Sequence, residues 1–331
     1  MLELKNYFTK DNLKSILIST HLNSDPDGIF SSITFISFIK HFCKDCEVKI
    51  YSEDFTLITR KIIDELNYWN LITQDLDGVN PDVIVLIDVN NIEIIGKIKD
   101  LIINGTPFIV IDHHSDMKRR KYEPIFSIIM EDYSSAAEVI FELFEKNNIK
   151  LSQADAKNLL LGILYDTKHF TIATNRTFQI VNEILKKGVS YRDTIRMLRY
   201  PLERSEKIAR LKAGNRAKIH TIGDWIIVSS EISSYEASAC RGLLNLGADV
   251  AIVQSLRKNE TRVSLRSTQE FYESTNISLS DLCIELIEIY KNSGNLELSA
   301  GGHTTAAGIN TSMKNKSLID TIIELIKKKL K

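Results

Sequence analysis

Short runs rich in β-branched and aromatic residues alternate with longer, helix-like segments in the first half of the chain. Residues 15–19 (SILIS), 47–51 (EVKIY), 83–87 (VIVLI) and 108–111 (FIVI) predict strands. The apolar stretch 29–42, which follows Gly28, has the length of a helix. Because apolar strands separated by helices are typical of a parallel sheet covered on both faces, we expect an α/β domain here.

The second half of the chain has a different order of elements. It predicts strands at 225–229, 249–256 and 261–266, and helices near 234–246, 280–291 and 315–329. A helix over 175–187 ends at Gly188, a residue suited to the end of a helix. We therefore expect two domains, over residues 1–190 and 215–331, joined by a basic interdomain linker at 191–214.

Composition and charge agree with two soluble domains. The chain has 331 residues, 42 basic and 43 acidic, and 44% of its residues are hydrophobic. At about 150 residues per domain, this length predicts two domains. Residues 186–218 carry 11 basic and 3 acidic side chains, and residues 118–121 (KRRK) are all basic. We interpret these segments as solvated surfaces, with a path for a nucleic acid strand as the alternative.

Membrane and secretion signals are missing from the pattern. No apolar run approaches the ~18 residues of a membrane span, and charged residues interrupt the first twenty positions. The cysteines (Cys43, Cys46, Cys240, Cys283) are too few for a disulfide framework, so we expect thiols. These features predict a cytoplasmic protein without a membrane partner.

Aspartate and histidine follow the ends of several predicted elements. Because ligands of parallel sheets bind beyond the carboxyl ends of the strands, these side chains are candidates for one site. The candidate ligands are His21, Asp25, Asp27, Asp88, His113, His114 and Asp166.

Imidazole and carboxylate groups together are the ligand set of Mn²⁺, Fe²⁺ or Zn²⁺. So many groups at one sheet edge would repel one another without cations. Two metals ~3.5–4 Å apart would relieve that repulsion and create a hydroxide nucleophile for in-line attack on phosphorus. One aspartate after a strand is usually a helix N-cap, but the conjunction of four motifs favours a metal site.

These motifs resemble those of the DHH phosphoesterase family, named for a triplet that is Asp112-His113-His114 here. The first motif is His21-x3-Asp25-x-Asp27-Gly28, the second is the Asp88 strand, and the fourth is Gly162-Ile163-x-x-Asp166-Thr167 with Phe170. Gly301-Gly302-His303-x-x-Ala306-Ala307-Gly308, preceded by Val263-Ser-Leu-Arg266-Ser, resembles the DHH-associated substrate domain. The resemblance implies a parallel-sheet catalytic domain, a smaller α/β substrate-binding domain and a cleft between them.

The resemblance also implies a role for each residue. Two Mn²⁺ ions, replaceable by Mg²⁺ or Co²⁺, would be bridged by Asp88. His21 and Asp25 would bind one ion, and Asp27, His113 and Asp166 the other. His114 would face the substrate phosphate, with Asp112 supporting the histidines. In the second domain, Arg266, Gly301, Gly302 and His303 would bind a phosphate of the substrate.

Two departures from the family pattern stand out. The glycine run before His303 is short, and Lys168 replaces a common glycine after Asp166-Thr167. The first shortens the stretch of bare backbone expected to hold the phosphate, and the second adds a positive charge near the metals.

The compact two-domain branch of the family implies small substrates. We expect hydrolysis of short oligonucleotides (nanoRNase), 3′-phosphoadenosine 5′-phosphate (pAp) or dinucleotides, because long nucleic acids need many phosphate contacts. The alternative is a RecJ-like exonuclease on single-stranded DNA or RNA. A non-catalytic scaffold in a replication or repair complex is the alternative from another class, but such a protein would have lost metal ligands. The sequence leaves the oligomeric state open, with a homodimer among the options.

Overall fold

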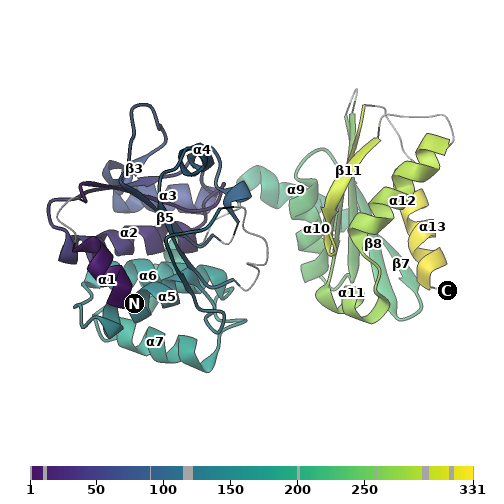
Figure 1. The fold of residues 1–331 in the computed structure, drawn as a ribbon. Coiled ribbons are helices and arrows are strands. Elements are labelled where there is room, and N and C mark those ends of the chain that lie inside the picture. The colour runs from purple at the N-terminus through teal and green to yellow at the C-terminus, as the bar shows by residue number, and fades with distance from the viewer. Residues whose placement is uncertain are drawn as a thin grey trace. The chain divides into compact units, whose positions relative to one another are not determined.

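Two units, each built on its own sheet, make up the chain (Figure 1). They comprise Met1–Tyr200 and Pro201–Lys331. The computed structural model describes residues 2–9, 13–89, 91–114, 122–199, 202–257, 260–292, 298–312 and 317–330. The basic segment 118–121 lies outside the described residues.

The first unit contains a six-stranded sheet in the order β3-β2-β1-β4-β5-β6. Every neighbouring pair is parallel, so the predicted parallel sheet is confirmed. The strands are β1 (Ser15–Ser19), β2 (Glu47–Tyr51), β3 (Ile72–Thr73), β4 (Val83–Ile87), β5 (Phe108–Asp112) and β6 (Phe126–Ile129).

Helices cover both faces of this sheet. Alternate residues of β1 show the division, because Ile16 and Ile18 pack with α2, α5 and α6, whereas Leu17 packs on the α4 side. The helices are α1 (Leu2–Phe8), α2 (Pro26–Phe42), α3 (Leu57–Leu66), α4 (Ile98–Ile103), α5 (Ala136–Lys146), α6 (Gln153–Asp166), α7 (Asn175–Leu185) and α8 (Tyr191–Met197), with short 3₁₀ turns at Trp69–Leu71 and Ile92–Ile94.

The second unit contains a mixed sheet in the order β11-β12-β10-β9-β8-β7. Only β8 and β9 pair in parallel among its described strands. The strands are β7 (Lys218–Ile222), β8 (Trp225–Ile232), β9 (Val250–Arg257), β10 (Glu260–Ser267), β11 (Leu298–His303) and β12 (Ala306–Thr311). The helices are α9 (Arg204–Asn215), α10 (Glu236–Asn245), α11 (Gln269–Thr275), α12 (Leu279–Asn292) and α13 (Leu318–Leu330).

Several local features differ from the sequence-based expectations. Segment 191–214, expected as a linker, contains α8 and most of α9, and the units divide at Tyr200. Cys43 and Cys46, expected as thiols, form a disulfide, because the chain turns just after α2 and brings their Cα atoms within 5.5 Å. In the part of the chain that the structure describes, no helix combines the length and apolarity needed to cross a bilayer.

Candidate metal centre

The strand order places the candidate ligands at one edge of the first sheet. The chain continues from β1 to β2 on one side and from β4 to β5 on the other, so the strand order reverses between β1 and β4, the place where ligands of open α/β sheets bind. His21 follows β1, Asp88 follows β4, and Asp112 ends β5. Asp166 reaches the same edge as the last residue of α6, near His113.

The loop after β1 fixes two carboxylates at the start of α2. Asp25 is the N-cap of α2, and its Oδ1 accepts a hydrogen bond from the Gly28 N–H at 3.1 Å. Asp27 lies buried in the first turn and accepts hydrogen bonds from the Ala136 and Ala137 N–H groups, at 2.6 and 3.0 Å. These two amides form the N-terminus of α5, whose positive end favours an ionised carboxylate.

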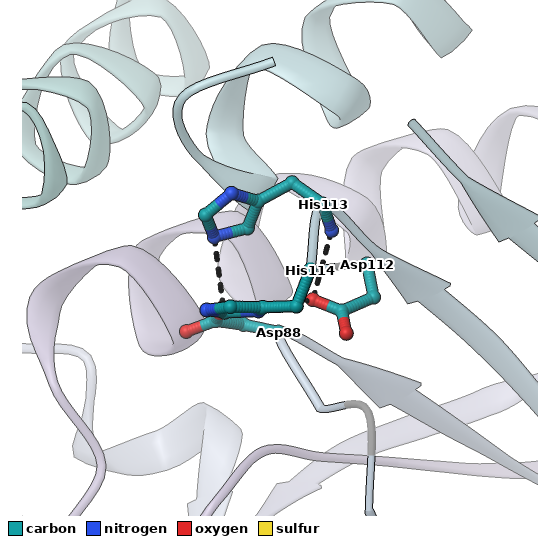
Figure 2. A group of neighbouring side chains, drawn as sticks. All are labelled: Asp88, Asp112, His113 and His114. Atoms are coloured by element: carbon teal, nitrogen blue, oxygen red, sulfur yellow. Dashed lines mark hydrogen bonds and ion pairs between the residues drawn. The ribbon is translucent and has the colours of Figure 1, made fainter. Parts of the chain in front are cut away.

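Asp88 lies at the centre of the cluster. Its Oδ2 is 3.7 Å from His21 Nε2, and its Oδ1 is 3.5 Å from His113 Nε2. Figure 2 shows the His113 ring pointing toward this carboxylate. Asp88 also has φ of 59°, a left-handed conformation that is costly for a residue with a side chain. The strained turn thus directs the two oxygens of one carboxylate toward two different histidines.

Backbone carbonyls orient the two histidines. His21 Nδ1 lies 2.7 Å from the Leu22 carbonyl oxygen, and His113 Nδ1 lies 3.3 Å from that of Tyr133. A carbonyl only accepts, so each Nδ1 carries the proton and donates it. In the neutral imidazole each Nε2 therefore carries the lone pair, on the side of the carboxylates, which is the usual arrangement of a metal-binding histidine.

Gly162 allows α6 to approach Asp27. A Cβ atom at this position would lie 2.5 Å from Asp27 Oδ1 and 2.9 Å from the Ala137 Cβ. Such distances are shorter than any ordinary contact, so a larger residue here would have to displace Asp27 or the helix. The close packing brings Asp166, one turn further along α6, within 3.1 Å of His113 Nε2.

The second histidine of the triplet has a different position. His114 Nδ1 lies 2.8 Å from Asp112 Oδ1, and the same oxygen accepts the His113 N–H at 2.8 Å (Figure 2). Asp112 is fully buried, whereas the His114 side chain is 49% exposed. Asp112 therefore holds both histidines, and His114 keeps Nε2 for a partner from solvent.

Burial and neighbouring charges raise the pKa values of two acidic side chains of the cluster. Burial, reinforced by neighbouring carboxylates, raises the pKa of Asp88 to about 6 despite the opposing His113 hydrogen bond. Burial also raises the pKa of Asp27, followed by repulsion from Asp166 and Asp88. Without cations, the cluster therefore disfavours the ionised form of these two acids.

The histidines respond in the opposite direction. Burial lowers the pKa of His21 and His113, but hydrogen bonds to carboxylates outweigh it and raise the values to about 9 and about 11. For His114, the hydrogen bond to Asp112 is the main cause of a raised pKa. Protons thus neutralise the carboxylates where cations are not present.

The residues fit divalent cations. In each of three groups of candidate ligands among the described residues, the ligand atoms lie within 4.8 Å of one another. Two of them are the predicted groups, His21, Asp25 and Asp88 in one and Asp27, His113 and Asp166 in the other, and the third is Asp88, Asp112, His113 and His114. Ions about 2.1 Å from each ligand hold ligand atoms roughly 3.0–3.5 Å apart, close to the nitrogen–oxygen distances found here. His113 Nε2 is buried and faces two carboxylate oxygens, Asp166 Oδ2 at 3.1 Å and Asp88 Oδ1 at 3.5 Å, as expected of atoms that share a cation.

The predicted ligands therefore lie together, in the two groups that the family resemblance implies, while their metal-binding role remains a prediction. Sequence reasoning missed the backbone groups that orient them, from Leu22, Tyr133, Ala136 and Ala137. Small residues before an apolar helix, at Ser134 to Ala137, were the available signal for the helix N-terminus that holds Asp27.

The predicted substrate residues all lie in the second unit. Arg266 is in β10 and pairs in register with Ala306 of β12, which pairs with His303 of β11. Gly301 and Gly302 belong to β11 rather than to a turn. The three strands therefore align Arg266 and His303 in one row across the sheet.

The first unit is similar in sequence to a known protein family. Residues 15–163 match the model of the DHH family, N-terminal domain. The chain is 29% identical over 328 residues to the uncharacterized protein MJ0988 of Methanocaldococcus jannaschii, covering 98% of this chain and 95% of the relative.

Other relatives carry names that state an activity. The cyclic-di-AMP phosphodiesterase GdpP of Bacillus subtilis is 26% identical over 327 residues, 93% of this chain but 46% of its own length. The probable bifunctional oligoribonuclease and PAP phosphatase NrnA of Streptococcus mutans is 29% identical over 204 residues, 60% of each chain. The chain thus spans about half of these two relatives.

The fold is shared with a solved structure. An exopolyphosphatase-related protein from Bacteroides fragilis superposes with a TM-score of 0.68 at 19% identity, covering 100% of this chain and 96% of that one. The solved structure therefore shows that the fold is shared, and the family match shows that residues 15–163, which contain every strand of the parallel sheet, are similar to the DHH family, N-terminal domain.

Proposed function

We propose that this protein is a metal-dependent phosphoesterase that hydrolyses short oligonucleotides or small nucleotides. The observation that carries the proposal is Asp88, whose two carboxylate oxygens face the two histidines of separate ligand groups. A carboxylate so placed is suited to bridging two cations. The histidine and aspartate ligands suit Mn²⁺, which is the metal we propose.

Divalent cations bound there would neutralise phosphate charge and lower the pKa of a water molecule. The residues of the chain position the reaction around them. Asp112 holds the His114 ring through Nδ1, so His114 Nε2 is the nitrogen left to contact a phosphate oxygen of the substrate. The raised pKa of His114 favours the imidazolium form, which binds an oxyanion more strongly than neutral imidazole does.

The proposed substrate class rests on charge and on relatives. A formal net charge of −1 favours ligands with few phosphates over long nucleic acids. GdpP is named for activity on cyclic-di-AMP, and NrnA is named as a probable oligoribonuclease and PAP phosphatase. In the second unit, we propose that Arg266, Gly301, Gly302 and His303 bind a phosphate of the substrate.

The test is hydrolysis measured side by side with Mn²⁺, Mg²⁺ or EDTA. The substrates are dinucleotides to pentanucleotides, pAp, cyclic dinucleotides, pyrophosphate and a long single strand. We expect Mn²⁺-dependent cleavage of one of the small nucleotide substrates. Cleavage of the long strand in preference to all of them would contradict the proposed substrate class, and no cleavage of any would contradict the phosphoesterase itself.

One observation favours activity on long strands as a second candidate. Arg199, Arg204 and Lys207 are exposed basic side chains, and Arg196 is exposed but paired with Asp193 at 3.5 Å. If these four side chains contact a single-stranded nucleic acid, neutralising them will make the slope of log affinity against log salt concentration shallower by ~0.7 per lost phosphate contact. Turnover of a dinucleotide should not change in the same variant.

A further inference from the structure

One face of the second sheet carries cationic side chains beside bare backbone. Arg266 and His303 occupy the same row, on strands that are second neighbours, so their Cα atoms lie about 10 Å apart on one face. This is the face on which α10 packs, because Ala251, which pairs with Arg266, belongs to the core between α10 and the sheet.

The strands beyond α10 leave this face open. Gly308 pairs with Gly301, and neither glycine presents a side chain. A Cβ at Gly301 would meet nothing within 4 Å, so the surface there is free of neighbouring atoms. Gly302 is required for a different reason, because a Cβ there would lie 2.2 Å from the Ala306 carbonyl oxygen. The result is a smooth strip of backbone next to Arg266.

The Arg266 guanidinium, beside these backbone groups, has no acidic partner among the described residues. Its Nε is buried and makes no hydrogen bond, and no ion pair of its guanidinium is found among the described residues. Burying a guanidinium donor without an acceptor is unfavourable, so the position is suited to an anion supplied by a ligand.

Arg241 belongs to the turn of α10 that contacts β10, the strand of Arg266. The preceding residue, Cys240, fixes the helix to the sheet, with its Sγ 3.1 Å from the Ser264 carbonyl oxygen and 3.5 Å from that of Ala251. Ser264 is two residues from Arg266 on β10, and Ala251 is its neighbour on β9. The turn of α10 that carries Arg241 is therefore anchored beside Arg266.

The neighbouring arginines differ in their partners. Arg210 packs against Gly242, donates to Ser238 Oγ at 2.7 Å and pairs with Glu206 at 3.6 Å. Arg241 has no hydrogen bond or ion pair of its side chain within the described part of the chain. Burial lowers the pKa of Arg241, the positive charges of Arg266 and Arg210 lower it further, and the Glu206 carboxylate opposes this shift only in part, so the charges of Arg241 and Arg266 act on each other.

We propose that Arg241 is a further substrate-binding residue that, together with Arg266, binds a phosphate group of the substrate. The inference rests on the proposed function, because it assigns the anion to a nucleotide substrate. Two guanidinium groups close together repel each other, the Glu206 carboxylate offsets only part of that repulsion, and a phosphate placed between the two groups removes it. The bare glycine strip gives the rest of a nucleotide room to lie against the backbone.

The experiment measures nucleotide binding without metal. Adenosine 5′-monophosphate is titrated calorimetrically into the EDTA-treated full-length chain, as wild type, Arg241→Gln and Arg262→Gln. Arg262 is the matched control, because it lies on the same strand and face as Arg266 but pairs with Glu260 at 2.6 Å. We expect Arg241→Gln to weaken binding about tenfold to a hundredfold, as for one lost charge-assisted contact, and Arg262→Gln to leave it within about twofold.

Thermal unfolding supplies a second readout that a merely structural role would not give. Without nucleotide, Arg241→Gln should unfold at or above the wild-type temperature, because repulsion from Arg266 is removed. With nucleotide, wild type should gain stability and Arg241→Gln should gain much less.

The outcomes separate this inference from the proposed function. Equal nucleotide affinity in wild type and Arg241→Gln overturns the role of Arg241, and so does a wild-type chain that binds no nucleotide at millimolar concentration. Failure of the phosphoesterase proposal would appear instead as no Mn²⁺-dependent hydrolysis by wild type, a separate measurement from binding in EDTA.

Discussion

Replacing Gly162 with alanine tests the packing that positions Asp27. The added Cβ would lie 2.5 Å from Asp27 Oδ1, whereas ordinary contacts begin near 3.4 Å, so helix or carboxylate must shift by about 1 Å. Overpacking of this kind costs about 1–3 kcal/mol, offset by up to ~1 kcal/mol from the better helix propensity of alanine. The larger effect is on the site, where a displacement of about 1 Å can cost on the order of 100-fold.

The assay is calorimetric titration of Mn²⁺ into EDTA-treated Gly162→Ala, with thermal unfolding in parallel. We expect affinity for at least one ion to fall about tenfold or more, while the variant still folds. Gly214→Ala is the control, because Gly214 also lies in a helix but a Cβ there meets only Leu246 at 3.7 Å. Wild-type Mn²⁺ affinity in Gly162→Ala would refute the account of how α6 positions Asp27.

Further predictions concern the roles of single residues and of pH. His114→Gln should lower kcat on the order of 100-fold while Mn²⁺ content stays unchanged, as measured by elemental analysis, and lost metal would instead make His114 a ligand. Arg266→Gln and His303→Gln should lower kcat/KM with unchanged Mn²⁺ content, and metal loss in either variant would contradict the assignment of metal and substrate residues to separate units. The raised pKa values of His21 (about 9) and His113 (about 11) contribute stability that is present below pH ~6.5 and lost as pH rises through those values. The metal-free protein should therefore become less stable from pH 7 to 10 while its Mn²⁺ affinity rises, as followed by thermal unfolding and titration, and a pH-independent affinity would contradict proton–metal competition.

Four strands of the first sheet were predictable because their signal is local. The runs 15–19, 83–87 and 108–111 are rich in apolar and β-branched residues, 47–51 contains Val48, Ile50 and Tyr51 at buried positions, and all four are strands in the structure. β3 has only two residues, and β11 contains two glycines, so neither has a propensity that marks a strand. Pairing with a neighbouring strand, which is not local, forms both.

Ligand types were predictable, but the contacts that orient them were not. His21 and Asp88 follow strands that the sequence identifies, and the fold brings those strand ends together. The left-handed turn at Asp88 and the two α5 amides on Asp27 depend on backbone geometry, which residue identity does not encode. Gly162 belongs to a motif that the sequence resemblance identifies. The need for a glycine there becomes visible only in the structure, where α6 packs against Asp27.

The most direct test of the metal centre is the number of Mn²⁺ ions that the chain binds. EDTA-treated protein is reloaded, freed of excess metal and analysed by elemental analysis and electron paramagnetic resonance. We predict two Mn²⁺ per wild-type chain with a spin-coupled signal, and loss of that coupling in Asp88→Asn, whose amide cannot bridge two cations. One uncoupled ion or none in wild type, or an unchanged coupled pair in Asp88→Asn, would contradict the two-metal centre bridged by Asp88.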